Sequence, residues 1–148
     1  MHWTSLRRAF VLCPVALIEV SSPVSKGKSM ISWGTILYGA ALSAAFALAA
    51  TFTLCRERKA LTLAVVFFAA LAGPVAWNAV LHSREASDFF VDAPVAVFPV
   101  SWQDVGSGVW TLAVASVALG LIGDRARRAA FLSVVTAAAA FLVDIYLY

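Results

Sequence analysis

Charged residues are scarce in this chain: they make up 13% of its 148 residues, whereas 62% are hydrophobic. A soluble domain carries about 25% charged residues, so the sequence lacks the polar surface that a water-soluble fold requires. The same numbers exclude intrinsic disorder, because disordered segments combine low hydrophobicity with high charge. The composition therefore predicts an integral membrane protein built as one small domain.

Cysteine and histidine are also few, with two residues of each type. Cys13 and Cys55 do not form a Cys-x-x-Cys motif, and we expect no disulfide. His82 with scattered aspartates is too little for a zinc site, and paired histidines for haem are missing. Phosphate-binding loops, Gly-x-Ser-x-Gly and Ser-x-x-Lys motifs are missing as well. We therefore expect no metal, no cofactor and no catalytic residues.

The net charge of +3 belongs to the first 29 residues, which hold four basic residues and one glutamate. From Met30 onward the chain holds seven basic and seven acidic residues. No basic stripe with interleaved aromatic residues occurs, so the sequence does not predict binding to nucleic acid.

Four apolar runs after Met30 match the length of a membrane crossing, which needs about 20 residues in a helix. They cover residues 31–55, 60–82, 105–123 and 129–148. Short polar turns join the first run to the second and the third to the fourth. We therefore predict an all-α integral membrane protein whose domain, residues 30–148, is an antiparallel bundle of four transmembrane helices.

The basic residues predict the orientation of this bundle. Six of the seven that follow Met30 lie in the turns 56–59 and 124–128, while the long loop 83–104 holds only Arg84. The positive-inside rule places both turns in the cytoplasm and the loop outside. In the same topology, tryptophans and tyrosines cluster toward the outer half of the bundle, because their rings favour the membrane interface. We expect the protein to lie in the plasma membrane.

Residues 1–29 form a leader that fits this membrane topology poorly. A basic start and a short apolar stretch imitate a signal peptide, but Pro14 and Glu19 interrupt the apolar part. The stretch is also too short to span a bilayer. We expect Met30 to be the true initiator and the leader to be an upstream mis-start. A cleaved signal and an interfacial segment are the alternatives.

Small residues recur along each predicted helix, and helices in lipid associate through such residues. The expected packing faces are Gly39, Ser43 and Ala47; Ala69 and Gly73; Ser116 and Gly120; and Ala137 to Ala140. Pro74 is expected to bend the second helix.

Asp144 is the only Asp, Glu, Lys or Arg within the predicted spans, and charged residues in spans are functional candidates. Asn78 and His82 lie four residues apart on one helix face at the same outer level. We predict a polar outer cluster of Asn78, His82, Asp144 and Arg84, in which Asp144 pairs with His82 or Arg84. The alternative for each is a structural hydrogen bond or exposure at the interface.

The loop 83–104 is apolar over much of its length and contains two prolines, which forbid a continuous helix. Long loops of this kind are often functional. We expect it to lie on the outer membrane surface or to cover the bundle mouth, and the alternative is a hydrophobic plug. The loop residues expected to contact a partner protein or lipid are Phe89, Phe90, Phe98, Trp102 and Asp104.

The first functional hypothesis is a non-enzymatic accessory or assembly component of the membrane. Its outer loop would contact a membrane protein partner or lipid, and the chain could form a homo-oligomer. The second hypothesis is a small transporter or pore, with an outer-side site for a cation or a polar solute. Residues 31–55 lack the membrane-embedded glutamate that identifies the small multidrug resistance transporters, so that family is excluded. A membrane enzyme is the least favoured hypothesis, and would use His82 with Asp88, Asp92 or Asp104.

Overall fold

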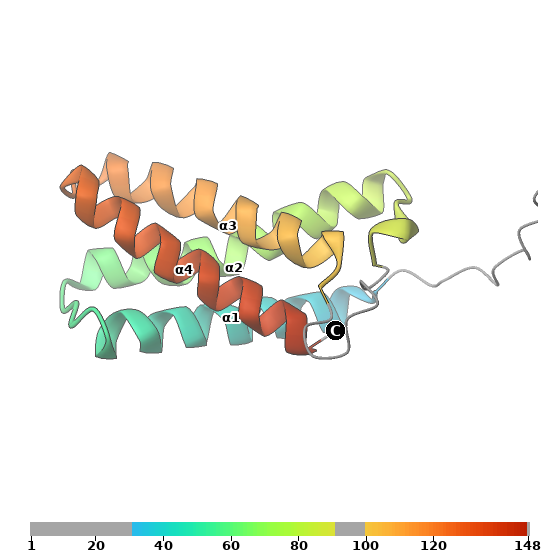
Figure 1. The fold of residues 1–148 in the computed structure, drawn as a ribbon, viewed down its shortest axis with the longest axis horizontal. Coiled ribbons are helices and arrows are strands. Elements are labelled where there is room, and N and C mark those ends of the chain that lie inside the picture. Colours follow the sequence, from blue (N-terminus) through green and yellow to red (C-terminus); the bar gives the residue numbers. More distant parts are fainter. Residues whose placement is uncertain (1–30, 91–99, 148) are drawn as a thin grey trace, which may run out of the picture.

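The computed structural model describes residues 31–90 and 100–147, which form four long α-helices and one short 3₁₀ helix (Figure 1). The elements are α1 (Trp33–Thr53), α2 (Ala60–Ser83), η1 (Ser87–Phe90), α3 (Trp102–Leu121) and α4 (Ala126–Leu147). Each α-helix is long and apolar enough to cross a membrane. The prediction of four membrane-spanning lengths of helix is thus confirmed. The predictions for the leader 1–29 and for Phe98 concern residues outside the described ranges.

The helices pack in a ring in which each contacts two neighbours: α1 with α2, α2 with α3, α3 with α4, and α4 with α1. A weaker diagonal contact joins α2 to α4. The α1–α2 and α3–α4 connections lie at one end of the bundle, here called the basic end (Figure 1). Helix η1, the start of α3 and the end of α4 lie at the other, the loop end.

Helix α3 begins at Trp102, three residues before the predicted start. The Ser101 side chain accepts a hydrogen bond from the Asp104 amide at 3.2 Å, and the Asp104 carboxylate accepts one from the Ser101 amide at 2.7 Å. This reciprocal capping box satisfies two amides at the helix start. Helix α4 also begins early, at Ala126, because the Arg125 carbonyl already accepts from the Ala129 amide at 2.9 Å.

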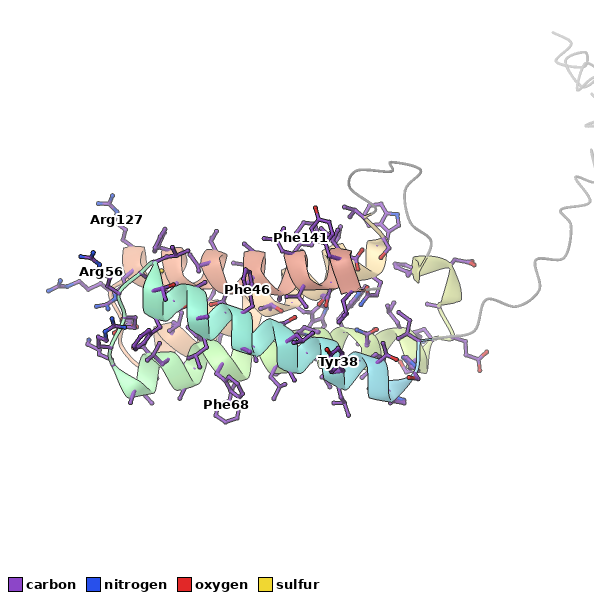
Figure 2. All side chains as sticks on the ribbon, turned by 90° about the horizontal axis from the view of Figure 1, so that it is seen from below. Tyr38, Phe46, Arg56, Phe68, Arg127 and Phe141 are labelled. Atoms are coloured by element: carbon purple, nitrogen blue, oxygen red, sulfur yellow. The ribbon has the colours of Figure 1, made fainter. Side chains whose placement is uncertain are left out.

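The bundle carries its large apolar side chains on the outside. Phe68 is 63% exposed and Phe131 is 59% exposed, and Figure 2 shows Phe68 directed away from the neighbouring helices. The interior contains alanines and several hydroxyl side chains, including Ser133 and Thr136. A water-soluble bundle has the reverse distribution, with polar residues outside and large apolar ones inside.

Several interior hydroxyls are accommodated by local hydrogen bonds, whereas those of Ser43, Thr51 and Ser107 have no partner among the described residues. Thr111 donates to the Ser107 carbonyl at 2.8 Å, and Thr136 donates to the Leu132 carbonyl at 2.7 Å. Each acceptor lies one turn earlier in the same helix, so the hydroxyl needs no water and no partner on another helix. Thr111 and Thr136 can therefore lie inside this bundle at little cost.

Small residues form the close contacts between helices, as predicted for α1 and α2. Gly39, Ser43 and Ala47 are buried, and Gly73 lies directly against the backbone of Thr111. The prediction for the third helix is wrong: Ser116 and Gly120 are exposed, and a β-carbon on Gly120 would meet nothing within 4 Å. The contact with Gly73 turns a different face of α3 inward from the one that carries Ser116 and Gly120. The buried face consists of Ser107, Gly108, Thr111, Ala115 and Leu119.

Candidate functional site

Two carboxylates are buried at the loop end of the bundle. Asp104 in α3 is 3% exposed, and Asp144 in α4 is 1% exposed. The two are close enough for Asp104 to act electrostatically on Asp144. Like charges in a buried site disfavour each other, so the pair needs neutralisation from another group.

Asp104 is held by the start of its own helix. Its Oδ2 atom accepts hydrogen bonds from the Ser101 amide at 2.7 Å and the Ser101 hydroxyl at 2.8 Å. A negative charge in the first turn is also stabilised by the helix dipole. Asp104 therefore has a clear structural role as the helix cap.

Asp144 has no equivalent support. Both of its carboxylate oxygens are buried and lack a hydrogen-bond partner among the described residues. The Ser107 hydroxyl lies close enough to influence the carboxylate, although the two groups do not meet in hydrogen-bond geometry. One turn earlier in α4, Phe141 packs on α3, where a β-carbon on Gly108 would lie 3.3 Å from the Phe141 Cβ atom. This contact fixes Asp144 against α3.

Helix α2 adds an amide side chain at the same level. Gly73 lies against Thr111, and Gly106 leaves the space that the Trp77 ring fills. These two contacts set the register of α2 on α3 and bring Asn78 level with Ser107. Asn78 is buried, its Nδ2 atom donates to the Pro74 carbonyl at 2.9 Å, and its Oδ1 atom has no partner in the described part of the chain.

These side chains form what we call the loop-end polar cluster: Trp77, Asn78, Gln103, Asp104, Ser107 and Asp144. Within residues 31–90 and 100–147, eight buried side-chain atoms lack a hydrogen-bond partner, and six of them belong to this cluster. They offer oxygen acceptors from Asp144, Asn78 and Ser107, together with N–H donors from Trp77 and Gln103. The six atoms thus form the largest group of unused hydrogen-bonding capacity in the described bundle.

The cluster has the chemistry of a site for a proton or a hard cation. An ionised carboxylate without a partner costs several kcal/mol to bury, so Asp144 requires a proton or a cation. Carboxylate, amide and hydroxyl oxygens are hard ligands. No group of three or more His, Cys, Asp and Glu side chains that could hold a metal ion occurs in the described ranges.

The structure brings together only part of the predicted polar outer cluster. Asn78 and Asp144 belong to the site, but His82 does not: its ring nitrogens lie 2.9 Å from the Asn78 carbonyl and 3.1 Å from the Ile31 carbonyl. Its ring also packs on Trp33 at 4.7 Å between centroids. Arg84 is exposed. The predicted pairing of Asp144 with His82 or Arg84 is therefore wrong, because Asp144 faces α3 while His82 faces the start of α1.

The residues predicted as loop contacts differ in their exposure. Trp102 is 69% exposed and Phe89 is 40% exposed, with the Phe89 ring edge-on to Trp77 at 6.2 Å. Phe90 is the last residue of η1. The prediction that Asp104 belongs to an outward loop is wrong, since the capping box draws it into the buried start of α3.

Three members of the cluster, Trp77, Gln103 and Ser107, were not predicted. The signal for two of them was present, because a serine followed three residues later by an aspartate marks a helix start. Beginning the helix after Ser101 places Gln103 and Ser107 one turn apart on the same helix as Asp104. Trp77 carried no comparable signal, because a tryptophan near a span end is also typical of the membrane interface.

The basic end holds a third buried acid, Glu57. Its carboxylate accepts hydrogen bonds from the Arg58 amide at 2.9 Å and the Lys59 amide at 2.8 Å, and it forms an ion pair with Arg128. Burial raises the pKa of Glu57, but the amides of Lys59 and Arg58 and the Arg128 guanidinium outweigh it, so the pKa lies below its ordinary value of 4.5. Burial and the nearby Glu57 carboxylate raise the pKa of the Cys55 thiol above its ordinary value of 9.0.

Comparison of the chain with protein families, with curated proteins and with solved structures found no match.

Proposed function

We propose that this chain is a multi-pass integral membrane protein, and that it acts as a small transporter or pore with a proton or monovalent-cation site at the loop-end polar cluster. The observation that carries the proposal is the Asp144 carboxylate, which is buried in a span-length helix and has no hydrogen-bond partner among the described residues. Ionisable residues in membrane spans are costly and commonly lie on ion pathways.

The inverted surface supports the membrane part of the proposal. Large apolar side chains cover the outside of the four helices, where lipid would solvate them, and hydroxyls lie inside. In this arrangement the helices run antiparallel across the bilayer. The basic turns lie in the cytoplasm and the loop end lies outside the plasma membrane, as the positive-inside rule requires.

The composition of the cluster supports the cation part. A purely structural aspartate in this position would pair with a hydrogen-bond donor, as Asp104 does with the Ser101 cap of its own helix. Asp144 instead lies within electrostatic reach of Asp104 and close to the Ser107 hydroxyl, and neither of its oxygens has a hydrogen-bond partner in the described part of the chain. A bound proton or monovalent cation would neutralise one of the two carboxylates and use the free oxygens of Asn78 and Ser107.

A second function is favoured by the exposure of Trp102. This side chain is 69% exposed at the loop end, where Phe89 of η1 is 40% exposed as well. An exposed tryptophan is a common anchor at protein interfaces. An accessory or assembly role, in which this surface contacts a membrane protein partner, is therefore the alternative proposal.

The transport proposal is tested with the purified full-length chain in liposomes. Fluorescent reporters inside the vesicles follow the entry of protons, Na⁺ and K⁺ down an imposed gradient. The wild-type protein is expected to conduct at least one of these ions, and Asp144→Asn is expected to abolish the flux. Asp88→Asn is the matched control, because Asp88 is an exposed aspartate at the same end.

Two results would contradict this proposal. One is a folded wild-type protein that conducts none of the three ions. The other is an Asp144→Asn protein that conducts as well as the wild type. If Trp102→Ala abolished co-purification with a membrane protein while Asp144→Asn did not, the accessory function would replace transport.

A further inference from the structure

A groove at the basic end of the bundle lies outside the loop-end polar cluster. Its volume is about 690 Å³. It is formed where the start of α2, the α3–α4 turn and the first turns of α4 meet. The residues that line it are Lys59, Gly123, Asp124, Arg125, Arg127, Arg128 and Phe131.

The groove has a strong excess of positive charge, with four basic side chains and one acidic side chain in its lining. Asp124 is already engaged, since its carboxylate accepts a hydrogen bond from the Thr62 hydroxyl at 3.5 Å. Arg128 is engaged by Glu57. In the described part of the chain, no carboxylate forms an ion pair with Lys59, Arg125 or Arg127. Three cations therefore remain available to a ligand.

The backbone favours the same kind of ligand. Helix α4 spans 22 residues and begins at Ala126. Since Arg125 and Arg127 line the groove, the first amides of α4 lie at its wall. The first amides of a helix lack acceptors within the helix, and its dipole attracts negative charge. Side chains and backbone together select an anion with several oxygens.

Phe131 distinguishes a lipid from a free anion. It lines the groove on the side toward the apolar body of the bundle and is 59% exposed. A free phosphate has no use for this aromatic surface, whereas an acyl chain leaving a bound headgroup would pack along it. Basic pockets between transmembrane helices on the cytoplasmic side are known to bind anionic lipid headgroups.

We propose that this groove binds the phosphate headgroup of an anionic phospholipid, with Lys59, Arg125 and Arg127 on the phosphate and Phe131 beside the acyl chain. Arg128 supports the site indirectly by holding the two basic turns together through Glu57. The lipid would thereby contact α2, the α3–α4 turn and α4 at once.

The test measures lipid retention by native mass spectrometry of the full-length chain in detergent. The probes are phosphatidylglycerol, phosphatidylcholine with the same acyl chains, and inorganic phosphate. The double variant of Arg125→Gln and Arg127→Gln is compared with Arg56→Gln, because Arg56 lies at the same end but does not line the groove (Figure 2). The thermal stability of each variant shows that it remains folded.

We expect the wild type to retain phosphatidylglycerol in preference to phosphatidylcholine. Removal of Arg125 and Arg127 is expected to weaken retention by about fivefold for each arginine, while Arg56→Gln has a smaller effect. Equal losses in the double variant and in Arg56→Gln would overturn the groove as a site, because the attraction would then come from the whole basic end. Equal retention of the two lipids, or complete competition by inorganic phosphate, would overturn the assignment to an anionic lipid.

Discussion

The Arg128 guanidinium donates a hydrogen bond to the Glu57 carboxylate, and this ion pair joins the α1–α2 turn to the first turn of α4. Glu57 is 2% exposed and also accepts the amides of Arg58 and Lys59, so one carboxylate organises the start of α2 and its contact with α4. The pair is the main polar connection between the two turns at the basic end within the described ranges.

Glu57→Gln is expected to lower the free energy of unfolding by about 1–2 kcal/mol, because it weakens charge-assisted hydrogen bonds whose Arg128 partner is partly exposed. Chemical unfolding in detergent micelles measures the change. Glu85→Gln is the control, since Glu85 is exposed in the connection after α2. A loss no larger than that of Glu85→Gln would show that the Glu57–Arg128 pair does not stabilise the bundle.

The same carboxylate predicts a pH dependence of stability. The pKa of Glu57 is lower in the folded chain than its ordinary value of 4.5, so its contribution is complete above pH 4.5 and is lost as the pH falls through the folded pKa. Melting temperatures measured from pH 7 down to pH 3 should fall in this acid range. The fall should be shallower in Glu57→Gln, and an identical acid limb in both proteins would refute the assignment to this residue.

Gly73 and Gly120 provide a matched pair of helix glycines. A β-carbon on Gly73 would collide with the Thr111 backbone, which cannot move aside, whereas Gly120 faces open space. Gly73→Ala should destabilise the bundle by about 1–3 kcal/mol, and Gly120→Ala should leave stability unchanged or raise it by up to about 1 kcal/mol. Thermal unfolding of the two variants checks both expectations. Similar effects of the two substitutions would show that α2 and α3 are not in this close contact.

Sequence patterns predicted the four helices because a membrane span needs only a sufficient length and apolar side chains. Both properties can be read directly from the sequence. The patterns did not predict the inward face of α3, because its small residues occur on two faces: Ser116 and Gly120 on one, and Gly108 and Thr111 on the other. The contacts of Thr111 with Gly73 and of Gly108 with Phe141 select between these faces, and these contacts depend on the register between helices.

The site was predicted in part for the same reason. Asp144 was identifiable as the lone Asp, Glu, Lys or Arg in a predicted span, and Asn78 as a polar residue at the same level. Their partners depend on how α2 and α4 rotate against α3, which no local pattern specifies. Asp104 is different, because the serine three residues before it predicts a helix cap from sequence alone.

Trp102→Ala separates the two proposed functions. Trp102 is exposed and is not a member of the loop-end polar cluster, so its removal should change stability by less than about 0.5 kcal/mol. Ion flux in liposomes should remain at the wild-type level. A loss of flux in a folded Trp102→Ala protein would contradict the assignment of the site to Asp144 and its neighbours.

The most direct test of the central claim is infrared difference spectroscopy of the full-length chain in lipid, recorded as protons, Na⁺ or K⁺ are added. The carboxyl band assigned to Asp144 is the one that is missing in Asp144→Asn and present in Asp88→Asn. Our account predicts that this band changes on addition of at least one of the three ions. An Asp144 band that stays the same with all three ions would contradict the account.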